Sequence, residues 1–388
     1  MIQTLQNADS ALKSAYLDVV AKELDYGVNP FFAELSKSTN NVVGKDVKKV
    51  VNCNMVGGLG AGDETGKLPT SDATDYKTLT VPLKNIYGTI EISDKAIRAS
   101  AHDSGAFVNL LNNEMESLLT TAKFQFSRML FGDGTGKLAT ITKVEEQNVT
   151  LDTLVGITKG MRVEFRYYDG MQDVLFAGLD FMVLSVDTET NTIVVDGDIL
   201  GLMEGASVHT SKAYGKELTG LSAIFSDKDI YGVSRSESLM QPVKITNAGE
   251  LSEATIQKAI DTVEEKCGGS INFILCSYGV KRALQNLLST YKRNVEVLEL
   301  KGGYKTISYN GIPVVADRFC PAGTMYLLNT KDFSIQQLCD WQWLEGEDGR
   351  VIKQVADKPV YKATLVKYAE LLCSRPCGQA VINGITEM

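Results

Sequence analysis

The stretch "SGAFVNLLNNEMESLLTTAKFQFSRMLF", residues 104–131, decides the architecture of this 388-residue chain. Its apolar side chains recur at steps of three and four, the period of one helix face. They are Phe107, Leu111, Met115, Leu118, Ala122, Phe126 and Met129. Asp103 or Ser104 can cap the start, and Gly132 ends the pattern. A helix of this length spans about 40 Å, so we expect a rod that braces an extended body.

Two glycine-rich stretches imitate phosphate-binding loops, "GDGTGK" at 132–137 and "GAGDETGKLP" at 60–69. A P-loop needs Gly, four residues, then Gly-Lys-Ser/Thr, because the hydroxyl holds magnesium. Leu138 and Leu68 stand at the hydroxyl position. A dinucleotide loop also fails, because Asp63 stands where a third small residue is needed. We predict a tight turn at 132–137 and a different role for 60–69.

Strand-like segments flank the second glycine-rich stretch. They are "KKVVNCNM" at 48–55 and "LTVPLKNIYGTIEIS" at 79–93, and the latter alternates, with Ile86, Gly88, Ile90 and Ile92 on one side. A loop as long as the one between them is either disordered or functional. An isolated hairpin is marginally stable in water. The pattern therefore predicts a long two-stranded excursion that lies on another surface.

The remaining segments divide by pattern. "SALKSAYLDVVAKELDY" at 10–26 is typical of a short amphipathic helix within a weakly patterned arm. Residues 138–218 switch to strand patterning, as in "GMRVEFRYYDG" at 160–170, where Glu164 falls on the polar side. Residues 250–357 alternate helix and strand, which favours an α/β unit. The segment from residue 360 onward is rich in strand formers.

Composition and charge exclude several classes of protein. The hydrophobic share is 44%, the charged share is 22% and the net charge is -9. An acidic chain is a poor match for a surface that wraps nucleic acid. We find neither a signal peptide pattern nor an apolar stretch that would span a membrane. The seven cysteines form no CxxC pair, which indicates reduced, mostly buried thiols rather than a zinc site.

Catalytic patterns are weak in this sequence. It has two histidines, of which His102 precedes the long helix beside Asp103 and His209 lies in a predicted strand. We interpret the first as a polar residue near a helix cap and the second as an ordinary strand residue. Trp341 and Trp343 stand two apart on a predicted strand and face one side. They can stack on a sugar, but a core or subunit contact is the favoured role. We predict no catalytic residue, cofactor or metal.

The order of these parts resembles the tailed-bacteriophage major capsid protein family, with the Hong Kong 97-like shell fold. The resemblance covers nearly the whole chain and rests on architecture more than on any single motif. It is carried by "GDETGKLPTSDATDYKTLTVPLKNIYGTIEISDKAIRAS" (62–100), "NLLNNEMESLLTTAKFQFSRMLFGDGTGK" (109–137), "KELTGLSAIFSDKDIYGVSR" (216–235), "NGIPVVADRFCPAGTMYLLNTKDF" (310–333) and "KATLVKYAELLCSRPCGQAVINGI" (362–385).

The resemblance implies an α+β chain with the domains of that fold. These are an N-terminal arm (1–50), an extended β-hairpin loop (51–92), a peripheral domain with the spine helix (93–137), an inserted β-domain (138–218), an axial α/β domain (219–357) and closing peripheral strands (358–388). In the family the extended loop reaches across a neighbouring subunit. The resemblance therefore implies that the following loop residues lie at a subunit interface: Gly62, Asp63, Glu64, Lys67, Pro69, Asp75 and Tyr76. Glycines and small polar residues suit such a loop because they let it bend and lie flat.

The function implied by the resemblance is that of a major capsid protein. Such a chain self-assembles into pentamers and hexamers of an icosahedral head in the virion, is assembled in the cytoplasm of the host bacterium, and encloses double-stranded DNA without reading its sequence. The implied partners are further copies of itself, a separate scaffolding protein, a portal and a decoration protein, with no membrane. The arm begins close to Met1, so we expect scaffolding from a separate chain or from a segment already removed.

Some family members join subunits through a loop lysine and a distant asparagine. Lys67, Lys77 and Asn383 do not match that pattern residue by residue, and we do not expect the cross-link. Two other functions stay open at this point. One is an encapsulin-like compartment shell with the same fold, and the other is a carbohydrate-binding or hydrolytic protein that uses Trp341 and Trp343.

Overall fold

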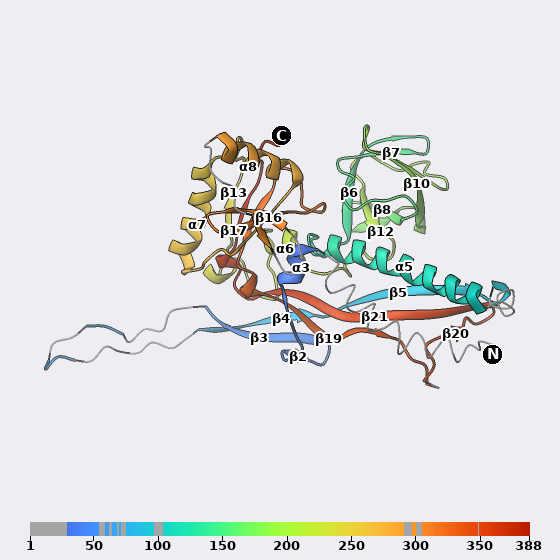
Figure 1. The fold of residues 1–388 in the computed structure, drawn as a ribbon, viewed down its shortest axis with the longest axis horizontal. Coiled ribbons are helices and arrows are strands. Elements are labelled where there is room, and N and C mark those ends of the chain that lie inside the picture. The colour runs from blue at the N-terminus through green and yellow to red at the C-terminus, as the bar shows by residue number, and fades with distance from the viewer. Residues whose placement is uncertain are drawn as a thin grey trace.

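The computed structural model describes residues 29–53, 59–61, 64–67, 70, 75–96, 104–290, 297–299, 305–347 and 349–388. The helix expected at 10–26 lies outside these residues, and so do His102 and Asp103. Helices and strands are mixed along the chain, as the α+β class predicted. An elongated base carries two bodies on the same side, and one hairpin projects beyond the base (Figure 1).

The base is built on the long helix α5 (Ser104–Met129), which confirms the helix predicted from the opening stretch. The helix lies along β5 and β21 of a sheet in the base (Figure 1). That sheet has the order β1 (Ser36–Ser38), β19 (Phe333–Trp343), β21 (Val360–Cys373) and β20 (Lys353–Gln354), with β5 (Lys84–Ser93) also paired to β21. Gly88 on β5 admits the helix, because a side chain there would meet Leu118 Cδ1 at 2.7 Å. The predicted alternation of residues 86–92 is confirmed.

Two small elements connect the base to its surroundings. A three-stranded sheet contains β2 (Val42–Val43), β3 (Asp46–Asn52) and β4 (Tyr76–Pro82). The short helix α3 (Pro30–Glu34) is capped by Asn29, whose Oδ1 accepts the Phe32 N–H at 2.7 Å. Phe31 packs edge-on against Phe333 of β19, and Phe32 packs edge-on against Phe126 of α5. These ring contacts fix the start of the described chain between the helix and the sheet.

Residues 137–210 form a closed β-barrel above the carboxyl end of α5 (Figure 1). Its strands follow the order β10 (Phe181–Asp187), β11 (Thr192–Val195), β7 (Asn148–Leu151), β6 (Lys137–Glu145), β12 (Ser207–Thr210) and β8 (Arg162–Tyr168). Pairing of β10 with β8 closes the ring, and β9 (Asp173–Leu175) extends β8 on its outer side. Closure removes free strand edges, which are otherwise a liability in small sheets. The turn η2 (Phe176–Gly178) follows β9.

The second body is an α/β unit, as the alternation within residues 250–357 predicted, but β19 and β20 of that range lie in the base sheet instead. Its sheet has the order β13 (Val243–Ile245), β22 (Ala380–Ile382), β18 (Met325–Leu328), β14 (Phe273–Cys276), β17 (Ile312–Ala316), β16 (Lys305–Tyr309) and β15 (Val297–Glu299). Helices α7 (Glu253–Cys267) and α8 (Tyr278–Thr290) pack against it. The predicted cap is confirmed, because Ser252 Oγ accepts the Thr255 N–H at 3.1 Å. The hairpin turns at Asn310 and Gly311, both with positive φ.

Short helical turns complete the path between the bodies. They are α6 (Leu221–Ile224), η3 (Ser238–Met240), η5 (Thr330–Asp332) and η6 (Pro376–Gly378). α6 begins where the chain leaves the barrel and returns to the carboxyl end of α5. The Leu221 N–H donates to Leu130 O at 2.8 Å, and Ser222 Oγ donates to Phe131 O at 2.6 Å. Base, barrel and α/β unit therefore meet at one junction.

Gly220 makes this junction possible. A Cβ atom at this position would lie 2.5 Å from Met129 O, 2.6 Å from Leu130 O and 2.7 Å from Gly132 O. These are backbone atoms at the end of a helix, so they cannot rotate away as a flexible side chain would. Any residue other than glycine must push the returning chain off the helix.

We predict that Gly220→Ala lowers the free energy of unfolding by about 3 kcal/mol or more, because overpacking against a fixed backbone adds strain. Chemical denaturation of the purified subunit measures the loss. Gly132→Ala is the matched control, since its Cβ would meet nothing closer than 3.4 Å. Equal stability of the two variants would contradict the steric account of the junction.

Candidate functional site

The hairpin of β3 and β4 has two different faces. Its register runs from Asp46 opposite Pro82 to Asn52 opposite Tyr76. One face buries Val47, Leu79 and Val81 in the core of the base. The opposite face is exposed and carries two large side chains, Val50 at 61% and Tyr76 at 63% exposed. The hairpin is thus packed on the base through one face and exposes Val50 and Tyr76 on the other, and it projects beyond the base (Figure 1).

Tyr231 fixes the hairpin to the base. Its backbone oxygen accepts the Thr80 N–H at 2.9 Å. Its buried hydroxyl donates to Leu371 O at 3.1 Å and accepts the Cys373 N–H at 3.2 Å. Burial raises the pKa of this phenol well above its usual value. β4 and β21 are therefore held by one residue, β4 through its backbone oxygen and β21 through its hydroxyl.

The structure describes part of the predicted loop interface. Gly62, Asp63 and Pro69 lie outside the described residues. Glu64, Lys67 and Tyr76 are exposed and Asp75 is half-buried. Lys77, which we considered for a cross-link, lies 3.4 Å from both Asp75 and Glu237. The interface role of these residues remains a prediction.

A buried ion pair joins the barrel to the long helix. Arg128 of α5 donates to both carboxylate oxygens of Glu217, with Nη1 at 2.8 Å from Oε2. The two side chains are 6% and 3% exposed. Arg128 Nε also donates to Gln125 at 3.0 Å, and the stem of Arg128 packs on the backbone of Gly156 in the barrel. A bidentate guanidinium–carboxylate pair fixes both distance and orientation.

A second buried cation lies under the base sheet. Lys367 of β21 is fully buried, and its Nζ donates to Gln337 at 2.8 Å and to Asp340. Burial alone would raise the pKa of Asp340, but the charge of Lys367 outweighs it and lowers that pKa to about 2. Lys37 adds a contact of 3.2 Å to the same carboxylate. The lysine is thus charge-compensated although it is inside the protein.

The two tryptophans are core residues rather than a sugar-binding platform. Trp341 and Trp343 are each 5% exposed. Trp341 packs edge-on against Phe126 of α5, and Lys367 Nζ lies 5.4 Å from its ring centre. Stacking on a sugar needs an accessible ring face, so the carbohydrate-binding alternative is wrong for these residues. The favoured core assignment is confirmed.

Glu370 is a buried acid that the sequence analysis missed. It is fully buried on β21, and its Oε1 accepts the Thr219 N–H at 2.7 Å and the Leu371 N–H at 2.9 Å. Burial raises the pKa of the carboxyl to about 7, against the opposing effect of these N–H donors. Thr219 precedes Gly220, so this acid lies beside the junction.

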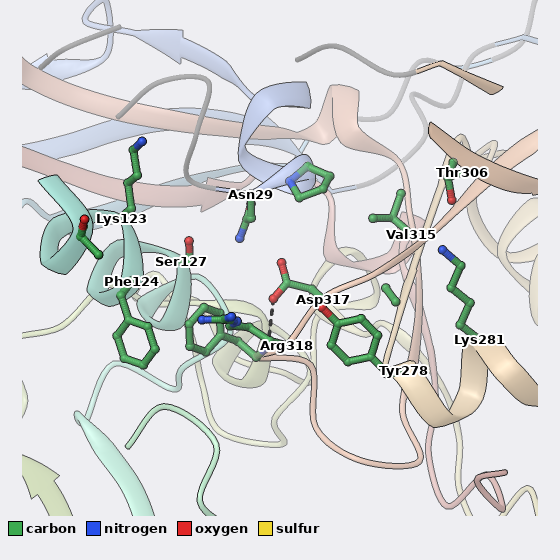
Figure 2. Close-up of a pocket in the computed structure, with 14 residues that line it drawn as sticks. Asn29, Lys123, Phe124, Ser127, Tyr278, Lys281, Thr306, Val315, Asp317 and Arg318 are labelled. Atoms are coloured by element: carbon green, nitrogen blue, oxygen red, sulfur yellow. Dashed lines mark hydrogen bonds between the residues drawn. The ribbon is translucent and has the colours of Figure 1, made fainter. Parts of the chain in front are cut away.

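A cavity of about 610 Å³ lies between α5 and the α/β unit (Figure 2). Lys123, Lys281 and Arg318 line its walls. Buried Asp317 accepts the Phe319 N–H at 2.9 Å, and burial raises its pKa to about 6. Within the described residues, Asn29 Nδ2 is buried without a hydrogen-bond partner. The cavity thus presents a carboxyl group and an unpaired donor.

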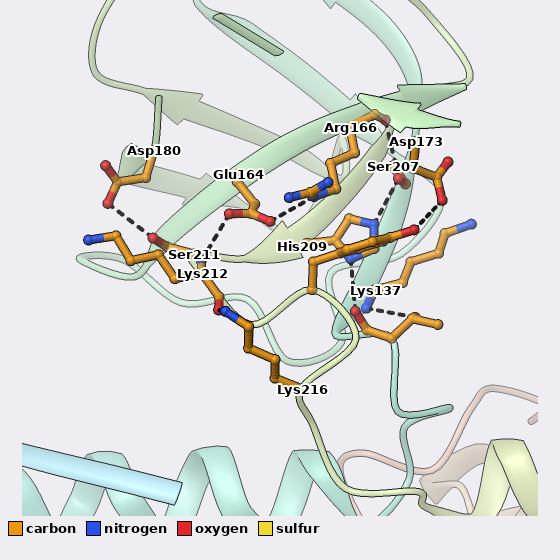
Figure 3. Close-up of polar contacts among 12 residues, drawn as sticks. Lys137, Glu164, Arg166, Asp173, Asp180, Ser207, His209, Ser211, Lys212 and Lys216 are labelled. Atoms are coloured by element: carbon orange, nitrogen blue, oxygen red, sulfur yellow. Dashed lines mark hydrogen bonds and ion pairs between the residues drawn. The ribbon is translucent and has the colours of Figure 1, made fainter. Parts of the chain in front are cut away.

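His209 belongs to a polar cluster on the barrel (Figure 3). Its Nδ1 faces Thr135 O at 3.3 Å, which assigns the proton to Nδ1, so Nε2 accepts from Ser207 Oγ at 2.8 Å. Burial lowers its pKa. The contact fixes the 132–137 turn, where Asp133 accepts the Thr135 N–H at 2.9 Å, as predicted for a tight turn. The His209 ring is oriented by a backbone oxygen rather than by a carboxylate. Ser207 and His209 therefore lack the acidic third member of a hydrolytic triad.

Glu164 beside this cluster corrects the sequence analysis. We placed it on the polar face of its strand, but it is 3% exposed. Its Oε1 accepts from Arg166 Nε at 2.8 Å and its Oε2 from the Lys212 N–H at 2.9 Å. The chain that leaves the barrel folds over this strand and covers the acid.

No group of metal-ligating residues occurs in the part of the chain described by the structure, and no described helix is long and apolar enough to cross a membrane.

Comparisons with known proteins agree with this architecture. The SU10 major capsid protein family matches residues 200–350. No curated protein matches the sequence. The subunit of the cyanophage A-1(L) capsid superposes with a TM-score of 0.55 at 15% identity, covering 92% of this chain and 93% of that one.

Two further structures are less similar. An encapsulin complex from Synechococcus elongatus PCC 7942 has a TM-score of 0.44 at 11% identity, covering 92% of this chain and 88% of that one. A chain in a structure of Mycobacterium phage Bobi superposes with a TM-score of 0.44 at 9% identity, covering 92% of this chain and 90% of that one. We draw no conclusion from these two.

We predict that Arg128→Met alone lowers the free energy of unfolding by about 3–5 kcal/mol, because it leaves the carboxylate of Glu217 buried and unpaired. The double variant Arg128→Met/Glu217→Met should lose much less, since neither charge then remains. Urea unfolding of both single variants and the double variant completes the cycle. Additive losses would show that the two side chains act independently.

We predict that Glu370 makes the subunit less stable as pH rises. Its folded pKa of about 7 lies above the ordinary glutamate value of 4.5, so its stabilising contribution is complete below pH 4.5 and is lost as pH rises through 7. The full change is about 3 kcal/mol. Glu370→Gln should flatten the stability profile between about pH 5 and pH 8, measured by denaturant unfolding. Glu64→Gln, at an exposed position, should leave the profile unchanged, and an unchanged profile in Glu370→Gln would refute the assignment.

Proposed function

We propose that the chain is a tailed-bacteriophage major capsid protein that assembles into pentamers and hexamers of an icosahedral head around double-stranded DNA, because residues 200–350 match the SU10 major capsid protein family and the chain shares its fold with a subunit of the cyanophage A-1(L) capsid. It is a structural protein of the virion capsid. The observation that carries the finer proposal is the β3–β4 hairpin, which is anchored in the base and exposes Val50 and Tyr76 on its outer face.

The hairpin is the proposed contact between neighbouring subunits. Large exposed apolar side chains and the edges of a small sheet are features that protein interfaces cover. Val50 is paired with Thr78 across the hairpin, and Tyr76 stands two residues from Thr78 on β4. Residues two apart on a strand share a face, so Val50 and Tyr76 lie on the same face. Tyrosine is frequent among residues that dominate binding energy. In this proposal the loop interface extends through Glu64, Lys67, Asp75 and Tyr76, and through Gly62, Asp63 and Pro69.

The division of the chain follows from the same proposal. We assign residues 1–50 to an arm, 51–92 to the extended loop, 93–137 to the spine-helix domain, 138–218 to an inserted domain, 219–357 to the axial domain and 358–388 to closing strands. Some strands cross these bounds, since β19 and β20 of the axial range pair in the base sheet and β22 of the closing range pairs in the α/β sheet. The net charge of the chain is -9, which favours a shell that holds DNA without adhering to it. A separate scaffolding protein, a portal and a decoration protein are the further partners, and we infer no enzymatic role.

We predict that the double variant Val50→Asp/Tyr76→Asp raises the subunit concentration needed for assembly at least tenfold, since each lost apolar contact costs about 1 kcal/mol or more. Negative-stain electron microscopy and light scattering of the chain, alone and with its scaffolding protein, measure this. Both positions are more than half exposed, so the subunit fold should persist.

Met171→Asp is the matched control, because Met171 is 92% exposed but lies on the barrel. Normal assembly of the hairpin variant would contradict the proposed contact. The diameter of the closed particles separates a phage head from a small encapsulin-like compartment. A monodisperse monomer under both conditions would refute the shell itself.

A further inference from the structure

The end of α7 and the η6 turn bring two cysteines together. Cys267 is the last residue of α7, and Cys377 lies in the middle of η6. The helix packs against this turn, and after burial the nearby Cys267 thiol is the next cause that raises the pKa of the Cys377 thiol. Both thiols are free. The chain thus holds a reduced cysteine pair that links positions far apart in sequence.

The backbone at Gly269 gives independent support for this arrangement. A Cβ atom there would lie 3.3 Å from Cys267 Sγ and 3.4 Å from the Cα of Gly378, the neighbour of Cys377. The Cys267 sulfur is therefore on the side of α7 that faces η6. Its thiol also lies 3.2 Å from Val263 O, which limits its rotation.

The two sulfurs differ in access. Cys267 is half-buried, whereas Cys377 is 4% exposed. Burial raises the pKa of the Cys377 thiol to about 12, and the charges of Arg375 and Lys266 oppose that rise. An oxidant from solvent therefore reaches Cys267 first, whereas burial keeps Cys377 protonated and less reactive.

We propose that Cys267 and Cys377 are an oxidation site that closes to an intrachain disulfide when the capsid meets a peroxide. Cys267 Sγ attacks one peroxide oxygen, the O–O bond breaks, and the first water leaves, which gives a sulfenic acid. Cys377 Sγ then attacks Cys267 Sγ, and its proton leaves with the hydroxyl as the second water. One peroxide is reduced to two waters, and two thiols are oxidised to one disulfide.

The bond would tie α7 to the segment that enters β22, which lies between β13 and β18 in the sheet of the α/β unit. It would close a long loop, and cross-links of long loops restrict the unfolded chain most. Reduced thiols suit assembly inside a bacterium, and a virion outside the cell meets oxidising conditions. Oxidation would thus stabilise the subunit without changing its contacts with neighbours. This biological setting rests on the proposed function, but the chemistry of the pair does not.

The test is treatment of the full chain with hydrogen peroxide, as free subunits and as assembled particles. Peptide mass mapping without reductant should find a Cys267–Cys377 disulfide, and a non-reducing gel should show an unchanged monomer band. Tm should rise by several degrees and return on reduction. Cys267→Ser and Cys377→Ser should both abolish the rise, whereas Cys339→Ser, at a half-buried thiol elsewhere, should keep it.

Three results would overturn the proposal. They are a stable sulfenic or sulfinic acid on Cys267 with Cys377 unmodified, a disulfide that joins different cysteines, and an unchanged Tm despite the expected bond. If either serine variant fails to fold, differential alkylation of the natural chain before and after peroxide decides whether both thiols are lost together. Because both cysteines are in one chain, free subunits give the answer even if no shell forms.

Discussion

The buried pair between Arg128 and Glu217 is the interaction on which the arrangement of the bodies depends. Arg128 lies in the last turn of α5, and Glu217 lies where the chain returns from the barrel. Two residues later Thr219 donates to Glu370, and Gly220 then packs on the carbonyls at the helix end. One short segment therefore meets the helix, the barrel exit and the central strand of the base. The charges are costly to bury, but their fork geometry sets the angle at which the chain returns.

Much of the fold could be predicted from local pattern. The four- and three-residue steps of residues 104–131 define α5 because one face of the helix is covered by the base sheet. Ser252 and Asn310-Gly311 mark a helix start and a hairpin turn, because capping and positive φ are local requirements. Closure of the barrel could not be predicted in this way. It depends on the pairing of β10 with β8, which no short-range signal encodes.

The polar interior was harder to predict than the fold. Glu164, Lys367 and Glu370 are charged residues in strands, and period-two patterning assigns such residues to solvent. β21 is paired on both edges and covered on both faces around Lys367 and Glu370, so these two charged side chains are inside. The sequence does contain one indication that these residues are buried, because Lys367 and Glu370 stand in an otherwise apolar run. Only their partners, on β19 and beside Gly220, explain why they are tolerated.

The contrast between β21 and the β3–β4 hairpin follows from where each strand finds its partners. β21 satisfies both edges within its own chain, through β5 and β19, so its side chains are fixed by folding alone. One face of the hairpin is buried against the base, and the other face leaves Val50 and Tyr76 in solvent. Burial of those side chains requires a second molecule. A rigid base and a poorly covered hairpin in one chain are what a repeated contact between identical subunits needs, because the base fixes the direction of the hairpin while its outer face stays free to adapt.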